Sequence, residues 1–442
     1  GIAKMFREGQ KGTMIGTEGY SPPEQYRGEA SPLADIYALG ATLHHLLTKR
    51  DPRMEPPFSF AERPIRQINP VVSIELETVI QTALKYSPQE RFQSAAAMKE
   101  ALLNAAKKTG ALSRINLPAV VSEQVVKPIW IFRCEDEIRG SASYDNGIIY
   151  VGSYDHNLYA LDAASGEFKW KFPTNGGIVT RPAITNDLIF VGSEDGNLYA
   201  ILPKTGKMAW TLPLESPIRS SPKIVEGHVF FGCDDGFFYG VNIVSMRRVM
   251  KVDAGMAIRS SPAVANDLVY FGNEGGDFLC LDFRGQLKWR FRAKRAITSS
   301  PLVTQGIVYF TSLDGSVYAL DAKSGWVIWR YRMMKGSVSS PYRVDHYLLF
   351  GSADGNIYCI DANNSREIWK YQTNHQVSGS PIVHKDMVFC GSADGNLYCL
   401  EVKTGRLRWK FATEGPITST PLIFNDTVYF GSADHIFYAI LV

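Results

Sequence analysis

Much of what marks a specialised protein is missing from this sequence of 442 residues. It contains no run of about 18 apolar residues, so no segment is expected to cross a membrane as a helix. A signal-peptide pattern is also missing, although the chain begins with Gly1 rather than Met. The six cysteines include no C-x-x-C pair, which argues against a zinc or thioredoxin-like site. A net charge of +3 lacks the basic excess that drives binding to nucleic acid or to a membrane surface.

What is present describes a folded chain of more than one domain. Hydrophobic residues make up 45% and charged residues 21%, a balance that is typical of proteins with a packed core. The length favours two domains, one of them large. Since their spacing suggests no ligand, the cysteines are expected to be reduced and mostly buried.

The first hundred residues carry the signals of three helices. The stretch 35–48 places apolar residues three and four apart, which predicts a helix with a buried apolar stripe. A second helix is predicted over 73–86, where Ser73 is a good N-cap, and a third over the alanine-rich stretch 94–106. Residues 107–126 have no clear period and are predicted to be a linker. The stripe of the first helix consists of Ile36, Leu39, Leu43, Leu46 and Leu47.

From residue 130 onward the sequence repeats itself. Tryptophan recurs in steps of 40, 40, 79, 40, 40 and 40 residues, and Met250 stands where the step of 79 lacks one. Units of about 40 residues built from short strands predict a β-propeller. The tryptophan of each unit is expected on the outer strand, where it packs between neighbouring blades. These tryptophans are Trp130, Trp170, Trp210, Trp289, Trp329, Trp369 and Trp409.

Most units carry a tight turn between their second and third strands. In "FCGSADGNLYCLEV" the turn is Asp394-Gly395, and Asp-Gly favours a hairpin because both central residues can adopt positive φ. The residue after the following tyrosine is small in most units, and in three units it is Cys280, Cys359 or Cys399. These thiols are expected to fill space in the core and not to bind a ligand.

Eight units can be counted, and the two ends of the repeat complement each other. The last unit ends at "FYAILV", after its third strand, whereas an extra tryptophan strand, "KPIWIFR" at 127–133, precedes the first unit. Strand 127–133 should therefore complete the last blade and close the ring, which removes exposed sheet edges. The predicted fold class is multidomain, with an all-α domain at 1–106 followed by an all-β eight-bladed propeller at 127–442.

The unit "GSADGNLYCLEVKTGRLRW" resembles the pyrroloquinoline-quinone-type propeller repeat, and the resemblance covers about 310 residues. It implies the fold strongly and the function weakly, because the family includes quinone-dependent dehydrogenases as well as non-enzymatic binding scaffolds. The dehydrogenases use two adjacent cysteines against the cofactor and an acidic and amide set for calcium. This chain has no adjacent cysteines, so pyrroloquinoline quinone is not favoured as a cofactor. A binding scaffold is the favoured function of the propeller.

Three arginines are the candidate binding residues of the propeller. Arg139, Arg219 and Arg259 stand three residues before the start of a first strand, where most units have a small or apolar side chain. First strands line the central channel of a propeller, so the three side chains could bind an acidic partner or a small anion near one mouth. The alternative, which is favoured, is that they pair with nearby acids such as Asp234 or Glu274, or are simply solvated.

The front of the chain resembles the C-terminal lobe of a bacterial-type serine/threonine protein kinase. Four segments carry the resemblance in the family's order and spacing. One departure is Pro22, which stands where the family has the alanine of A-P-E. The segments are "GIAK" (1–4), like the end of the D-F-G motif; "GTEGYSPPE" (16–24), like the end of the activation segment; "DIYALG" (35–40), like the start of the central helix; and "KYSPQERFQSAAAMKEAL" (85–102), like the closing region.

The resemblance implies roles for five residues. Glu24 and Arg91 would form a buried ion pair that ties the activation segment to the lobe. Asp35 would accept hydrogen bonds from the catalytic loop, or would only complement the charge of its helix N-terminus. Thr17 would lie beside the substrate site. Thr13 is either the phosphoacceptor that orders the loop or an ordinary loop threonine.

The remaining kinase machinery does not occur in residues 1–442. Phosphoryl transfer needs a glycine-rich loop, a lysine paired with a glutamate, the H-R-D-x-x-x-x-N loop and the D-F-G aspartate. No catalytic residue is therefore expected in this chain, and ATP and Mg²⁺ would belong to an intact parent kinase. The leading hypothesis is a fragment of a cytoplasmic kinase that acts on protein substrates and whose propeller binds a regulatory protein or ligand. The alternatives are a non-catalytic propeller scaffold with a vestigial kinase-like cap and, less favoured, a quinone-dependent oxidoreductase.

Overall fold

The computed structural model describes residues 17–29, 31–108, 126–185 and 187–442. Thr13 and most of the expected linker lie outside these residues. The chain divides into two compact units, residues 1–120 and 121–442, and each is described by itself. None of the helices in the described ranges has both the length and the apolar character needed to cross a membrane.

The first unit is helical, and its three long helices confirm the predicted ones. Ser73 caps the second of them, because its hydroxyl accepts a hydrogen bond from the Leu76 N–H at 3.2 Å. The described α-helices are α1 (Pro23–Tyr26), α2 (Leu33–Thr48), α3 (Ile65–Ile68), α4 (Ile74–Ala83) and α5 (Ala95–Lys108). Short 3₁₀ helices lie at η1 (Pro52–Met54), η2 (Ser59–Glu62) and η3 (Pro88–Glu90).

The apolar stripe predicted for α2 is wrong in part. Leu39 and Leu46 are 47% and 69% exposed, whereas Gly40 and Ala41 are buried. A Cβ added at Gly40 would lie 3.0 Å from the Ala83 Cβ, so α2 and α4 approach each other closely through small residues. The contact face therefore includes Gly40 together with Leu43 and Leu47, but not Leu39 or Leu46, and periodicity alone could not show which leucines lie in it.

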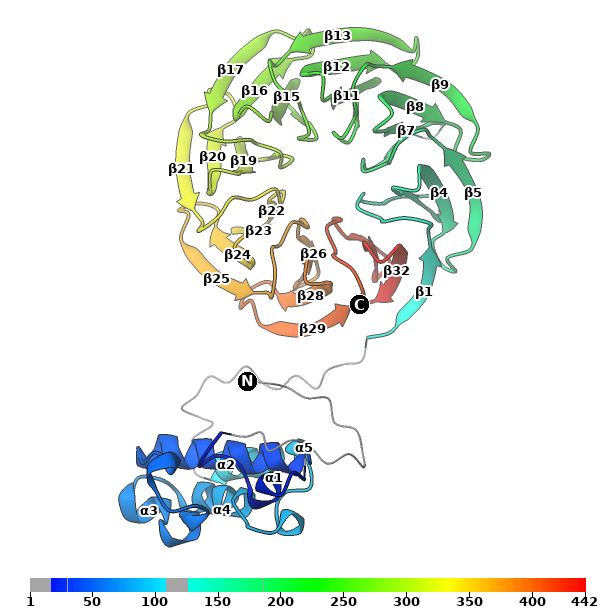
Figure 1. Cartoon of the computed structure of the whole chain (residues 1–442). Helices are drawn as coiled ribbons and strands as arrows, with labels where there is room; N and C mark the ends of the chain where they lie inside the picture. The colour runs from blue at the N-terminus through cyan, green and yellow to red at the C-terminus, as the bar shows by residue number, and fades with distance from the viewer. Residues whose placement is uncertain (1–16, 30, 109–125, 186) are drawn as a thin grey trace. The chain divides into compact units, whose positions relative to one another are not determined.

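The second unit is a propeller of eight four-stranded antiparallel sheets arranged around a ring (Figure 1). The innermost strands are β2 (Ser143–Asp145), β6 (Ala183–Ile184), β10 (Lys223–Val225), β14 (Ala263–Ala265), β18 (Leu302–Thr304), β22 (Tyr342–Val344), β26 (Ile382–His384) and β30 (Leu422–Phe424). The second strands are β3 (Ile148–Gly152), β7 (Ile189–Gly192), β11 (His228–Gly232), β15 (Leu268–Gly272), β19 (Ile307–Ser312), β23 (Tyr347–Gly351), β27 (Met387–Gly391) and β31 (Thr427–Gly431). The third strands are β4 (Asn157–Asp162), β8 (Asn197–Ile201), β12 (Phe237–Asn242), β16 (Asp277–Asp282), β20 (Ser316–Asp321), β24 (Asn356–Asp361), β28 (Asn396–Glu401) and β32 (Ile436–Leu441). The outer strands are β5 (Phe168–Pro173), β9 (Met208–Pro213), β13 (Arg247–Asp253), β17 (Leu287–Arg292), β21 (Val327–Arg332), β25 (Glu367–Gln372), β29 (Leu407–Ala412) and β1 (Pro128–Arg133).

The ring closes as predicted. Strand β1 is the outer strand of the last blade and pairs antiparallel with β32, with Trp130 opposite Ala439 and Phe132 opposite Phe437. The order of this sheet is β1-β32-β31-β30, so the start of the propeller and the end of the chain share one blade (Figure 1). This pairing covers the edge that β32 would otherwise expose.

The repeating tryptophans join neighbouring blades, which confirms their predicted place. Trp170 on β5 donates its indole N–H to the Pro203 carbonyl of the next blade at 2.9 Å. The ring lies against Gly206, where an added Cβ would approach it to 2.6 Å. Gly206 has φ +66°, so this turn needs glycine both for its backbone and for the space that the indole occupies.

The Asp-Gly turns differ from the predicted hairpin type. Only the second residue has positive φ, as at Gly196 (φ 85°), and His156 (φ 68°) takes this conformation in a degenerate copy. The aspartate contributes through its side chain: Asp195 accepts the Asn197 N–H at 2.9 Å and the Tyr199 hydroxyl at 2.8 Å. The sequence pattern located the turn correctly, but these local side-chain bonds set its geometry.

Stability of the propeller should fall in acid because of these aspartates. Burial by itself raises the pKa of Asp195, Asp354 and Asp394, but the hydrogen bonds that each carboxylate accepts outweigh it, so the pKa of each lies below its usual value. A folded-state pKa below the unfolded one stabilises the fold above the unfolded pKa, about 3.9, and this stability is lost as pH falls through the folded pKa. Thermal unfolding followed by circular dichroism should show a midpoint that drops below about pH 4. A smaller acid-induced drop is expected for Asp195→Asn, and an unchanged drop would contradict this assignment.

Candidate functional site

The kinase-like features of the helical unit centre on a buried ion pair. Arg91 Nη1 donates to Glu24 Oε1 at 2.6 Å, and Nη2 donates to Oε2 at 2.9 Å. The Arg91 side chain is fully buried and that of Glu24 is 7% exposed. This is the ion pair that the motifs predict, and its two-pronged geometry is the strong form of such a contact.

Further contacts hold the Arg91 guanidinium in place. It donates to the carbonyls of Lys85 at 2.7 Å, Tyr86 at 3.0 Å and Leu33 at 3.3 Å. Its carbon also lies 4.8 Å from the centre of the Tyr37 ring. Burial raises the pKa of Tyr37, with Arg91 opposing the shift, so this phenol stays neutral beside the ion pair. The pair thus joins α1, α2 and the segment before α5.

The other predicted kinase-like residues are not gathered around this pair. Thr17 is exposed, and its carbonyl accepts the N–H groups of Tyr20 at 3.0 Å and Ser21 at 3.1 Å. Asp35 is exposed in the first turn of α2, and its carboxylate bonds to no other described residue. The structure therefore brings Glu24 and Arg91 together and leaves Thr17 and Asp35 at the surface, where their roles stay predictions.

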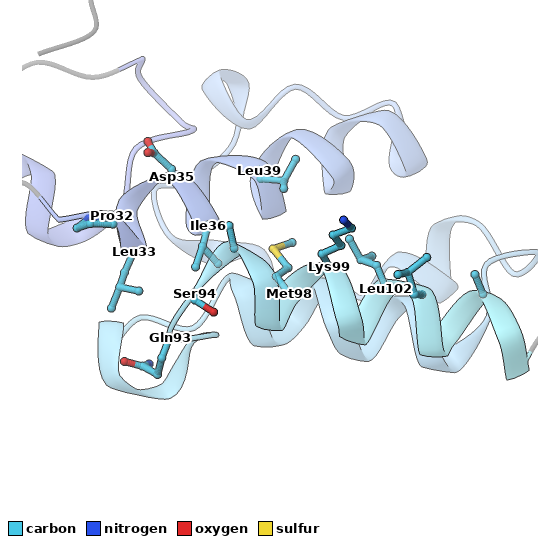
Figure 2. Close-up of a pocket in the computed structure, with 13 residues that line it drawn as sticks. Pro32, Leu33, Asp35, Ile36, Leu39, Gln93, Ser94, Met98, Lys99 and Leu102 are labelled. Carbon is cyan, nitrogen blue, oxygen red and sulfur yellow. The ribbon is translucent and has the colours of Figure 1, made fainter. Parts of the chain in front are cut away.

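A groove of about 570 Å³ lies between α2 and α5 (Figure 2). Its walls are mostly apolar, with Leu39 on α2 and Met98 and Leu102 on α5, and Asp35 lies at its edge. Apolar side chains gathered in an open groove usually mark a surface that another segment or molecule covers.

On the propeller, two kinds of connection lie at the same end of each blade. One leads from an outer strand to the next inner strand, and the other is the turn between the second and third strands. Backbone bonds join them, from the Tyr154 N–H to the Glu137 carbonyl and from the Glu194 N–H to the Gly177 carbonyl, both at 2.9 Å. We call this end of the propeller the turn face, and it carries the three candidate arginines.

A chain of contacts runs along the turn face over the first four blades, and we call it the charged arc. At its start Arg139 Nε donates to Glu137, and the guanidinium carbon lies 4.9 Å from the centre of the Tyr154 ring. The Tyr154 hydroxyl then donates to Glu194 at 3.4 Å. The arc consists of Arg139, Tyr154, Glu194, Arg219, Asp234, Arg259 and Glu274.

The rest of the arc alternates arginine and acid. Arg219 Nε donates to Glu194 at 2.7 Å and its Nη1 donates to Asp234. Arg259 Nε donates to Asp234 at 3.2 Å, and its Nη1 lies 3.2 Å from Glu274. Burial lowers the pKa of Arg219, but the neighbouring acids outweigh it and hold that pKa above its ordinary value.

Each candidate arginine is thus paired with at least one acid. Pairing with nearby acids is the alternative that the sequence favoured over binding of an anion. The three arginines contact four acids, which are Glu137, Glu194, Asp234 and Glu274, so the arc offers no net positive charge to an anion. At the same positions the other four blades are uncharged, as at Val338 and Ala353. The alternating arginines and acids of the arc are therefore confined to one half of the ring, and such a pattern suits contact with a polar protein surface.

Sequence reasoning missed Tyr154 and Glu194 as members of the arc. Both stand immediately before the aspartate of the turn between the second and third strands. The last three blades have alanine at this position. Comparison of this position across the eight units would have shown the departure. Its geometry relative to the arginines could not be deduced, because the contacts join different blades.

The cysteines of the chain lack the adjacent pair that the resemblance ties to quinone-dependent enzymes. The six cysteines are free and buried, and none is adjacent to another in the sequence. Burial raises the pKa of Cys280, Cys359 and Cys399 to about 12, so these thiols stay protonated as core residues. Over the described ranges, no three His, Cys, Asp or Glu side chains are grouped in a way that could hold a metal ion.

Fold and sites together define an eight-bladed β-propeller protein with a helical unit before the propeller. The family model described as outer membrane protein assembly factor BamB matches residues 119–245, 245–374 and 353–441. The chain belongs to this family of propeller-repeat proteins. The four kinase-like segments all lie outside the matched residues.

Solved structures support the same fold. BamB from Moraxella catarrhalis has a TM-score of 0.63 and 19% identity, and the match covers 72% of this chain and all of that one. A europium-containing methanol dehydrogenase has a TM-score of 0.59 and 15% identity, covering 72% of this chain and 87% of that one. At these identities the likeness concerns the fold alone.

The curated relatives are bacterial serine/threonine protein kinases. The kinase PknB of Mycobacterium leprae is 32% identical over 117 residues, which are 23% of this chain and 19% of that kinase. The chain spans under a fifth of the length of the curated relatives that it matches. The resemblance to bacterial kinases is therefore shown, over a fragment only.

Proposed function

We propose that the chain is a fragment of a serine/threonine protein kinase whose propeller binds a regulatory protein or ligand. The ordered kinase-like segments, the match to bacterial kinases and a fold that commonly serves protein interaction support this proposal. In the intact kinase, ATP and Mg²⁺ would bind to residues that precede Gly1, and protein serine or threonine would be the acceptor.

The ion pair between Glu24 and Arg91 is the observation that carries the proposal. It joins two of the kinase-like segments, 67 positions apart, in a buried and bidentate contact. A chance likeness of short motifs gives no reason for these two side chains to meet inside the fold. In a kinase the pair would anchor the activation segment, with Thr17 on the substrate side and Thr13 as the candidate phosphoacceptor.

The uncovered surface of α2 also supports a larger kinase domain. Leu39 and Leu46 are exposed, and Leu39 lines the groove beside α5 (Figure 2). We expect the segment that precedes Gly1 in the intact kinase to cover this groove and to supply the backbone groups that Asp35 would accept. Burying Leu39 in this way would contribute roughly 1.5–3 kcal/mol.

The 442-residue chain is expected to transfer no phosphate. It contains no glycine-rich loop or H-R-D-x-x-x-x-N loop, so it has neither the ATP site nor the catalytic base. Radiolabelled ATP and a general serine/threonine acceptor protein provide the assay. Any transfer above that of heat-denatured protein would contradict this expectation.

The reading frame upstream of Gly1 tests the proposal that the chain derives from an intact protein kinase. We expect an H-R-D-x-x-x-x-N loop about 15–20 residues before Gly1 and a lysine further upstream. The full-length product should then phosphorylate protein, and replacing the H-R-D aspartate with asparagine should abolish transfer. A stop codon or unrelated sequence there would overturn the kinase proposal.

The second candidate is a non-catalytic propeller scaffold with a vestigial kinase-like cap. It is favoured by the charged arc, a ready polar binding surface that needs no kinase activity. For the kinase candidate we propose a cytoplasmic location, because phosphorylation of proteins by ATP takes place there. A fusion of the full-length product to a fluorescent protein, followed by cell fractionation, tests the location.

A further inference from the structure

A ring of hydroxyl groups surrounds the start of the innermost strands. Seven blades have a proline just ahead of the innermost strand, and the first blade has Ala142 there. The residue before this position is serine or threonine in seven of the eight blades, and these residues are half-buried. Six of these serine oxygens accept the backbone N–H of the equivalent residue in the preceding blade, at 2.8 to 3.3 Å. The ring consists of Ser141, Ser221, Ser261, Ser300, Ser340, Ser380 and Thr420.

The ring presents hydrogen-bond donors to the central channel. Each serine oxygen already accepts a backbone N–H, and none of the ring hydroxyls donates to any residue in the described ranges. A hydroxyl in this state still has its O–H group to donate. The innermost strands of the blades surround the ring centre (Figure 1), and several neighbouring pairs of them contact one another. Because the ring residues stand just before these strands, we expect their O–H groups to face the channel.

The second blade breaks the ring with Arg181. Its backbone N–H bonds to Ser221 as the pattern requires, but its side chain replaces a hydroxyl with a guanidinium. Nε donates to the Ser143 oxygen of the first blade at 3.2 Å, and neither Nη group meets an acceptor among residues 126–185 and 187–442. Unlike Arg139, Arg219 and Arg259, it has no acidic partner within that range.

The surroundings of Arg181 are those of a group inside a channel. Its side chain is exposed, yet desolvation by the surrounding protein lowers its pKa and no neighbouring charge contributes. A surface arginine would be exposed without being desolvated, and a core arginine would be buried. The guanidinium keeps its charge, because an arginine remains protonated throughout the neutral range.

We propose that Arg181 and the hydroxyl ring form a binding site for a small oxyanion such as phosphate, sulfate or a carboxylate. The site offers O–H and N–H donors and one uncompensated positive charge, and these suit an acceptor-only ligand. The free Nη groups can bond two oxygens of one anion, and hydroxyls of the ring can bond the rest. The site is separate from the charged arc and does not rest on the kinase proposal.

Calorimetric titration of the full chain with sodium phosphate, at ionic strength held constant with chloride, tests the site. Saturable binding is expected, and parallel titrations with sulfate and acetate show which oxyanion is preferred. Arg181→Ser restores the residue of the other blades, so it should fold normally and weaken binding at least about tenfold. Arg181→Lys, which keeps the charge but not the two-pronged donor, should bind with intermediate affinity.

The matched control is Arg259→Thr, which removes an equal charge from the arc and installs the residue of blades five and eight. It should bind phosphate as the unmodified chain does. Equal weakening by Arg181→Ser and Arg259→Thr would show a general charge effect and overturn the site. The proposal would also be overturned if none of the three oxyanions bound saturably at concentrations up to about 10 mM, because a specific site should have a Kd below that concentration.

Discussion

Replacing Arg91 with alanine should destabilise the helical unit by about 3–5 kcal/mol, because Glu24 would keep a buried charge without a partner. The Arg91 side chain is fully buried, and it also donates to three carbonyls that would lose their donor. Unfolding in urea, followed by the helical signal in circular dichroism, should show the transition of this unit shifted to lower denaturant. In a unit of this size such a loss approaches the whole stability of a small domain.

The same unit offers a matched control. Arg53 pairs with Asp51 through Nη2 at 2.5 Å, but the Arg53 side chain is 59% exposed. Since exposed pairs are screened by solvent and contribute little to stability, Arg53→Ala should leave the urea transition nearly unchanged. In a double-mutant cycle, Glu24→Gln should recover part of the stability that Arg91→Ala loses. Equal shifts for Arg91→Ala and Arg53→Ala would contradict the role assigned to the buried pair.

The propeller could be predicted almost completely because the same sequence pattern recurs in each of its blades. A period of 40 residues, seen at tryptophan and again at Asp-Gly, fixes the blades even where one copy is degenerate. The closure by β1 followed from counting strands at the two ends, and its pairing with β32 confirms it. Each blade packs against its neighbours in the same way, so an inference from one unit holds for the others.

The helical unit has no internal repeat, so its sequence pattern leaves the packing face of a helix ambiguous. Leucines at helical spacing on α2 predict an apolar face, but two of them are exposed and α2 approaches α4 most closely at Gly40. Close approach of two helices depends on the partner surface, which periodicity does not contain. Exposure of Leu39 and Leu46 is therefore information that only the structure supplies.

The side chains at the propeller channel show a second limit. The three arginines of the arc were found as departures from the repeat, and pairing with acids was weighed as an alternative. Which acids they meet depends on the angle between blades, as when Arg219 reaches Glu194 of the preceding blade. Arg181 departs from the repeat as plainly as these three, but only the structure shows that it lacks an acidic partner within the described ranges.

Closure of the ring makes Trp130 the tryptophan whose loss should matter most. Its side chain is 9% exposed, its indole donates to the Ala163 carbonyl at 3.1 Å, and its ring lies against Gly166 of the first blade. Trp130→Ala should therefore destabilise the propeller by about 3–5 kcal/mol, the usual cost of emptying a large aromatic site. A loosened β1 would also expose the edge of β32, so light scattering on heating should rise with the loss of stability.

Two other tryptophans serve as controls that distinguish the effect of opening the ring from the effect of losing a buried side chain. Trp326 is 78% exposed and stands outside the repeat, so Trp326→Ala should change stability by no more than about 0.5 kcal/mol. Trp369 is 8% exposed and donates to the Val402 carbonyl at 2.7 Å, but its blade is continuous in the chain. Trp369→Ala should thus cost a similar free energy of unfolding without the added scattering, because no strand is free to leave its blade. If Trp130→Ala behaved like Trp326→Ala, β1 would not hold the ring closed.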